Sequence, residues 1–178
     1  MYQFPDTTVL CNFAAVDEMP LLREYLGSNG RWVQSIEGEL KKSLQVHSAL
    51  GAIWRENWFE DPIILNRGDE PERVERFRRI HMGGLREKPT QHLGESESFV
   101  ALTNRAALRG SVFLTDDHDA YRLFAKFDVQ VADTLDVLRS LVGRSSISAV
   151  KGLEIARRMD SEDRNLRRPP SGLADLTR

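Results

Sequence analysis

Short apolar runs alternate with longer amphipathic segments along most of this chain, and this alternation restricts the fold more than any other feature. The runs with the composition of strands are Tyr2–Phe4 (leading to Val9-Leu10), Trp32-Val33, Ile63–Leu65, Val112–Leu114 and Val129–Val131. The segments with apolar residues at three- and four-residue spacing, as in helices packed on one face, are Pro20–Leu26, Ile36–Leu50, Glu70–Ile80, Glu95–Leu108, Ala120–Phe127 and Thr134–Val142. The pattern predicts an α/β fold, with a parallel sheet covered by helices on both faces.

The chain of 178 residues is long enough for one domain that folds without disulfide bonds, and its single cysteine cannot form one. Residues 160–178 mix charge, proline and glycine without periodicity. We therefore expect a folded domain over 1–150, followed over 151–178 by a C-terminal helix and a mobile tail. The single cysteine leads us to expect a reduced, cytoplasmic protein, and no apolar run is long enough to cross a bilayer, so we expect no membrane anchor.

Acidic residues follow two of the predicted strands. Asp6 comes shortly after Tyr2–Phe4, and Asp116 and Asp117 follow Val112–Leu114 and Thr115. The carboxyl ends of the strands in an open parallel sheet lie along one edge, where ligands bind. Two separate strands are thus expected to deliver acids to the same edge.

Two further pairs of acids lie in predicted helices. Glu37 and Glu39 share one segment, and Glu95 and Glu97 share another; alternate residues point to nearly opposite sides of a helix. Only one member of each pair can face a common site, and we favour Glu39, which directly precedes Leu40, and Glu95, at its helix start. Each acid taken alone has an ordinary explanation as a helix cap or a solvated side chain. Together they would repel one another, and a hard divalent cation such as Mg²⁺ or Mn²⁺ would stabilise the cluster.

Four segments in this order resemble motifs of the PIN-domain nuclease family: FPDTTVLCNFA, SIEGELKK, LGESESFVAL and the stretch from VFLTDDHDAYR to the following helices. LGESESFVAL is similar to the GEAEAI-type element of one PIN subgroup. The resemblance covers about residues 2–143, with a poor match over 44–91. It implies a three-layer sandwich around a central parallel sheet of about five strands.

The resemblance also implies a site and an activity. Carried over by position, the metal-binding acids of the family fall on Asp6, Glu39, Glu95 or Glu97, and Asp117, with Asp116 beside it. The hydroxyl groups near the metal fall on Thr7 or Thr8 and on Thr115. The implied chemistry is Mg²⁺-dependent hydrolysis of single-stranded RNA by activated water, with Asp6, Glu39, Glu95 and Asp117 as the catalytic set. Many relatives are toxins of toxin–antitoxin pairs.

Basic residues are concentrated between Arg73 and Lys88: this segment holds six basic and two acidic side chains, a local excess of +4. Such a stripe can follow an RNA backbone, and Arg76 and Arg79 are the candidates for substrate binding. The same arginines could instead pair with acids one helical turn away on a solvated face. RNA is thus the expected partner, and an antitoxin protein or a second copy of the chain are further candidates.

Two other functions fit the same residues. One is a PIN fold without activity that binds RNA or another protein, and the other is a nuclease that cleaves DNA in defence or repair. Trp54 and Trp58 are spaced one helical turn apart, which favours core packing over base stacking. The scattered histidines and the lack of a GxxxxGK[ST] loop argue against a zinc site and a P-loop.

Overall fold

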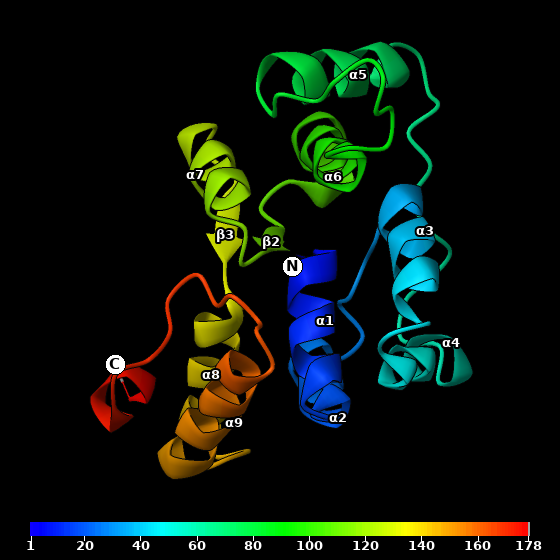
Figure 1. Ribbon diagram of the computed structural model, residues 1–178. Helices are drawn as coiled ribbons and strands as arrows, with labels where there is room; N and C mark the ends of the chain where they lie inside the picture. The colour runs from blue at the N-terminus through cyan, green and yellow to red at the C-terminus, as the bar shows by residue number, and fades with distance from the viewer. Residues whose placement is uncertain (178) are drawn as a thin grey trace.

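Three short parallel strands form the sheet of the computed structural model, which describes residues 1–177 (Figure 1). Strand β1 (Gln3–Pro5) pairs with β2 (Val112–Leu114), and β2 pairs with β3 (Gln130–Ala132), in the order β1-β2-β3. Residues far apart in sequence thus meet in register, with Pro5 opposite Leu114. The α/β class with parallel strands is confirmed, although helices dominate the chain.

The prediction of about five strands is wrong for the part of the chain that the structure describes. On the side of β1 that faces away from β2, the described residues form only isolated parallel bridges, which join Gln3 to Gly30 and Val33 to Ile63. The predicted strands at 32–33 and 63–65 are therefore reduced to single bridge positions. A helix begins at Gln34, directly after Val33, so the backbone turns away before a ladder can form.

Helices follow the strands closely along the chain. They are α1 (Thr7–Ala15), α2 (Met19–Leu26), α3 (Gln34–Ser43), α4 (Ala52–Arg55), α5 (Glu70–Ile80), α6 (Leu93–Asn104), α7 (His118–Lys126), α8 (Thr134–Gly143) and α9 (Ala149–Ser161), with 3₁₀ turns η1 (Ser48–Gly51), η2 (Ala106–Leu108) and η3 (Leu173–Leu176). The periodicity predicts α5 with its exact bounds. Val9 and Leu10, placed at the end of the first strand region in the prediction, belong to α1 and are fully buried.

Helices lie on both sides of the sheet. Figure 1 shows α6 and α7 on one side, with α5 outside α6, and α1, α2, α8 and α9 on the other. Aromatic rings fill the space between sheet and helices on the α7 side, where Phe124 stacks on Phe113 of β2 at 4.2 Å between centroids. Both rings are fully buried. Burial of apolar surface of this kind is the main stabilising contribution to such a fold.

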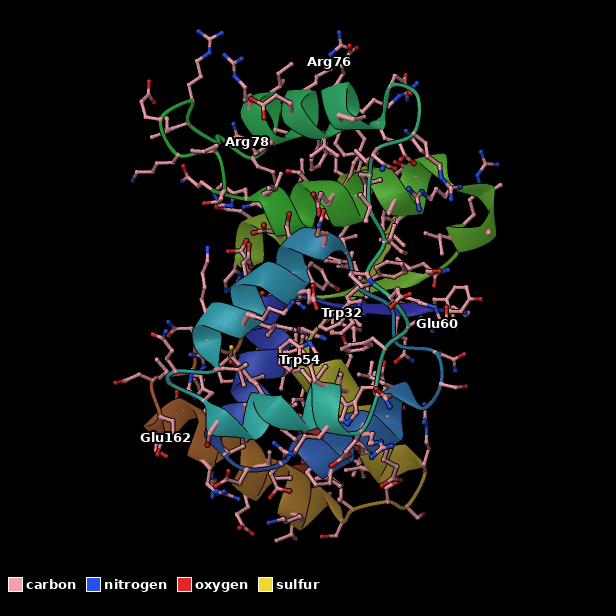
Figure 2. The ribbon with its side chains drawn as sticks, turned by 90° about the vertical axis from the view of Figure 1, so that its right-hand side faces the viewer. Trp32, Trp54, Glu60, Arg76, Arg78 and Glu162 are labelled. Atoms are coloured by element: carbon pink, nitrogen blue, oxygen red, sulfur yellow. The ribbon has the colours of Figure 1, made fainter. Side chains whose placement is uncertain are left out.

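The tryptophans pack on α3 and the chain that follows it. The rings of Trp32 and Trp54 lie 5.7 Å apart, side by side in Figure 2, and Trp58 is 7% exposed. Because α4 ends at Arg55, Trp58 is not on the same helix as Trp54, contrary to the spacing argument. Their packing nevertheless agrees with a structural role.

The C-terminal segment is held against the domain. Arg167 and Arg168 form ion pairs of 2.6 Å with Asp133, which is fully buried at the start of α8, and Leu176 is 1% exposed. The sequence predicts a mobile tail here, but the buried charge of Asp133 requires a partner, which this segment supplies. Helix α9 packs on α1 and α8, so it belongs to the same core as the predicted 1–150 domain. No helix among the described residues is both long and apolar enough to span a bilayer.

Candidate active site

Asp6 lies at the carboxyl ends of the strands, between β1 and α1. Its backbone N–H donates to the carbonyl oxygen of Leu114 at 2.8 Å, which holds it beside the end of β2. Its side chain is almost fully buried and accepts hydrogen bonds from the Thr7 N–H (2.7 Å) and from the hydroxyls of Thr8 (2.9 Å) and Thr115 (3.1 Å). These donors fix the carboxylate while it caps the first turn of α1.

Glu39 reaches the same site from α3. Its Oε2 accepts a 2.8 Å hydrogen bond from the hydroxyl of Thr7, the residue next to Asp6. Helix α6 comes close at this point, because Gly94 has no side chain: a Cβ there would lie 3.4 Å from Glu39 Oε1 and 2.5 Å from Ile36 Cδ1. Gly94 therefore permits the close packing of α3 and α6 that brings two glutamates to one site.

Glu95 occupies the first turn of α6, beside Gly94, and its Oε1 lies 3.3 Å from the Nδ1 atom of His92. Burial, together with the charges of Asp6 and Asp117, raises the pKa of Glu95 to about 7. Burial likewise raises the pKa of Glu39 to about 7, with Asp6 and Glu95 contributing. The charge of Asp6 thus raises the pKa of both glutamates, and Glu95 also raises that of Glu39, so these carboxylates form one electrostatic cluster.

Asp117 completes this cluster from the start of α7. Its Oδ1 accepts the Ala120 N–H at 2.7 Å, and its backbone N–H donates to the Thr115 hydroxyl at 3.1 Å. Burial raises the pKa of Asp6, and the charge of Asp117 adds to this effect. Thr115 touches both acids, since its own hydroxyl hydrogen is donated to Asp6. We call Asp6, Glu39, Glu95 and Asp117 the acidic cluster.

Three other acids named by the sequence have different roles. Asp116 is buried and accepts hydrogen bonds from the Asn12 amide (2.7 Å), the Thr134 hydroxyl and the Arg167 N–H (3.2 Å). These bonds tie α1, α8 and the C-terminal segment together, so its oxygens are already engaged.

The second members of the two glutamate pairs also point elsewhere. Glu97 accepts the Ser35 N–H at 3.0 Å, at the start of α3. Glu37 forms an ion pair of 2.8 Å with Lys41. The packing of α3 and α6 therefore selects Glu39 and Glu95 for the acidic cluster, and it leaves Glu97 and Asp116, both predicted metal ligands, in hydrogen-bonding roles.

No lysine or arginine among residues 1–177 forms an ion pair with a member of the acidic cluster. Other buried acids do have such partners: Glu70 pairs with Arg105 at 2.8 Å, and Asp133 pairs with two arginines. Buried carboxylates without a counter-charge are costly, and here they repel one another as well. The four carboxylates therefore lack the lysine and arginine ion pairs that other buried acids have; His92 lies beside Glu95, and the charge of Lys42 lowers the pKa of Glu39 only in part.

A preformed metal cage is absent from the described part of the chain, where no three His, Cys, Asp or Glu side chains are grouped to hold an ion. The cluster offers only oxygen atoms, the donors that Mg²⁺ and Mn²⁺ prefer. Mg²⁺ is commonly held by one or two carboxylates, with water and phosphate completing its shell. The donor set therefore fits such an ion chemically.

The predicted substrate-binding arginines lie on α5. Arg76 projects outward from this helix (Figure 2), and Arg79 lies 4.0 Å from Glu75. Arg78, between them, is 1% exposed and donates to the carbonyl oxygens of Leu85, Lys88 and Gln91. The basic stripe is therefore not one continuous exposed surface. Arg78 is buried and holds the 85–91 loop, whereas Arg76 and Arg79 on either side of it are exposed.

Two residues that the sequence analysis did not select also lie at the site. Arg164, in the C-terminal segment, donates from Nε to Asn12 Oδ1 at 3.0 Å. Both line a cavity of about 390 Å³ together with Thr8 and Asp117. Asn12 could have been found, since it follows Thr8 by one turn of α1. The sequence carries no corresponding signal for Arg164, which lies in the segment expected to be mobile.

Comparisons of this chain with protein-family models, curated proteins and solved structures find no match. The function must therefore be inferred from the geometry and chemistry of the site.

Proposed function

We propose that this protein is a nuclease that requires Mg²⁺ or Mn²⁺ and hydrolyses phosphodiester bonds of single-stranded RNA. The observation that carries the proposal is the acidic cluster: four carboxylates from four chain segments gather near the strand ends, and among the described residues none of them is paired with a lysine or an arginine. A site built this way suits a divalent cation and, through it, a phosphate group.

Each residue of the cluster has a definable part in this proposal. Asp6, Glu39, Glu95 and Asp117 would hold the cation, and the bound cation would activate water and stabilise charge on the leaving oxygen. Thr115 positions Asp6 and Asp117 through its hydroxyl, and Thr7 orients Glu39. Glu39 and Glu95 must ionise to bind a cation, so binding should release protons near neutral pH.

The resemblance of four segments to PIN-domain nucleases supports the same activity and adds a biological role. On that basis we propose that the chain acts in the cytoplasm as the toxin of a toxin–antitoxin pair. The proposal predicts growth arrest on expression of the intact chain and none on expression of an Asp6→Asn variant.

A binding module without catalysis is the second candidate. It is favoured by the absence, within residues 1–177, of three side chains already grouped to hold a metal. Such a module would bind RNA equally well with or without a divalent cation and would leave it intact. The experiment below separates the two functions.

The test is incubation of the purified chain with end-labelled single-stranded RNA and DNA, in Mg²⁺, in Mn²⁺ and in EDTA. We expect cleavage of RNA that depends on the cation and is lost in Asp6→Asn. Asp160→Asn is the matched control, because Asp160 is exposed on α9 and does not line the cavity beside Asp117, so this variant should remain active. RNA cleavage that persists in EDTA and in Asp6→Asn would disprove the assignment. Cleavage of DNA in preference to RNA would change the proposed function to that of a DNA nuclease.

A further inference from the structure

Two surface cavities continue from Asp117 across α7 toward α5. The first, about 380 Å³, is lined by Asp117, Arg122, Lys126 and His81, among others. The second, about 540 Å³, shares His81 and is lined by the rings of Phe77, Phe99 and Phe127. Because His81 borders both, the two form a continuous surface that begins at the acidic cluster. We call this surface the α7 track.

The first part of the track presents free positive charge. Arg122 and Lys126 are both exposed and lie one helical turn apart on α7, so they face the same side. Among the described residues, neither forms an ion pair or a hydrogen bond through its side chain. Asp119, two residues after Asp117 in the sequence, also lines this cavity. The two cations are therefore available to an anionic ligand that approaches Asp117.

The second part of the track is aromatic. Phe127 is 40% exposed, and its ring lies 5.2 Å from Phe99 and 5.3 Å from His81 in edge-to-face geometry. The rings of Phe77 and Phe99 stack at 3.8 Å. An exposed large aromatic side chain beside an open cavity is unfavourable in water and suits a flat, apolar ligand.

The rim of the aromatic cavity is also charged. It holds two acids and two arginines, but Asp69 is paired with Arg73 at 2.7 Å. Arg76 and Glu72 remain there without a described partner. The track thus combines flat aromatic surface with unpaired cations at both of its cavities, the two features by which proteins hold the bases and phosphates of single strands.

We propose that the α7 track binds single-stranded nucleic acid on one side of the bond to be cut, with phosphates at Arg122 and Lys126 and a base against Phe99 and Phe127. Along α7, Asp117 and Phe127 are separated by about 15 Å, enough for a few nucleotides. A duplex keeps its bases stacked inside, so only an unpaired base can enter the aromatic cavity. The inference rests on the proposed function, since it assigns the substrate path of that site.

The first test is binding of a fluorescently labelled single-stranded RNA to the full chain in EDTA, followed by anisotropy. The double variant Arg122→Gln/Lys126→Gln should bind about tenfold more weakly at low salt, and its salt slope should fall by about 1.4. Arg157→Gln is the matched control, because Arg157 is exposed on α9 and should bind as the wild type does.

The second test addresses the base cavity. Phe127→Leu keeps an apolar side chain but removes the ring, and it should weaken binding about tenfold. Because a variant can also disturb packing, the same question is asked of the unchanged protein with RNA that carries one abasic nucleotide. Moving the abasic position along the strand should reveal one place where the loss is largest. Equal affinity at all positions would disprove a base cavity.

These tests separate the track from the nuclease assignment. Binding that weakens in the track variants without any cation-dependent cleavage would support the track and refute the nuclease. Cleavage with unchanged binding in every track variant would refute the track and leave the nuclease standing. Preference for duplex RNA over the same sequence as a single strand would also overturn the track, and binding of single-stranded DNA in its place would support it.

Discussion

Replacing Glu39 with glutamine should stabilise the protein at pH 8 in the absence of divalent cations, although it alters the acidic cluster. Burial, together with the charges of Asp6 and Glu95, raises the pKa of Glu39 from 4.5 to about 7. Between pH 4.5 and about pH 7, the folded protein therefore binds more protons than the unfolded chain. Its stability falls as pH rises through this window, so the ionised Glu39 destabilises the fold at pH 8.

The size of the stability gain follows from the difference between the pKa of Glu39 in the folded protein and in the unfolded chain. A rise in pKa from 4.5 to about 7 corresponds to roughly 3 kcal/mol of unfolding free energy well above both values. Glu39 is only partly buried, so water screens part of the repulsion, and we expect a gain of about 1–2 kcal/mol in Glu39→Gln. Glutamine retains a carbonyl oxygen that can accept the 2.8 Å hydrogen bond from Thr7, which limits other losses.

The assay is urea denaturation of both proteins in EDTA at a series of pH values. The stability gain should be largest at pH 8 and should shrink toward pH 5. Glu37→Gln is the control: Glu37 lies on the same helix but pairs with Lys41 at 2.8 Å, so its loss should bring no gain at pH 8. A Glu39→Gln variant that is less stable at pH 8, or whose gain does not depend on pH, would refute the electrostatic argument.

Three further predictions concern the cation, the packing and the C-terminal segment. Affinity for Mg²⁺, measured by calorimetry, should rise as pH rises through 7, because two glutamates with a pKa of about 7 must ionise; affinity independent of pH would contradict this. Gly94→Ala should cost about 1–2 kcal/mol in thermal unfolding, since its Cβ would lie 2.5 Å from Ile36, whereas Gly143→Ala, with open space, should cost nothing measurable. Asp133→Asn should cost about 3 kcal/mol and speed tryptic cleavage after Arg164 and Arg167; unchanged cleavage would show that the ion pairs do not hold this segment.

Much of the local structure was predictable because its causes are local. The apolar period of α5 gives its bounds, and Asp6 caps α1 where the strand pattern stops. The sheet was predicted less well. The segments at Val33 and Ile63 have strand-like composition, but pairing also requires a partner in register over several residues, and α3 begins too soon to allow it.

The candidate site was predictable in part. The strand ends indicated Asp6 and Asp117, and helical spacing indicated one glutamate from each of two pairs. Which glutamate faces the cluster depends on the packing of α3 on α6, and Gly94 decides how close these helices come. Helical spacing alone does not separate Glu95 from Glu97, since both lie on one helix; Glu95 is favoured for its place at the helix start, and the neighbouring helix α3, where Ser35 binds Glu97, decides between them.

By itself, the sequence determined the α/β class, most of the helices and the acids that follow the strands, because these depend on periodicity and on neighbours along the chain; the predicted helix over 36–50 ends at Ser43 in the structure. Only the tertiary structure decided that Asp116 is consumed by hydrogen bonds, that the C-terminal segment brings Arg164 to the site, and that α7 carries a track from Asp117 to Phe127. The physical reason is that burial, charge compensation and cavities arise between segments distant in sequence. No local pattern records those contacts.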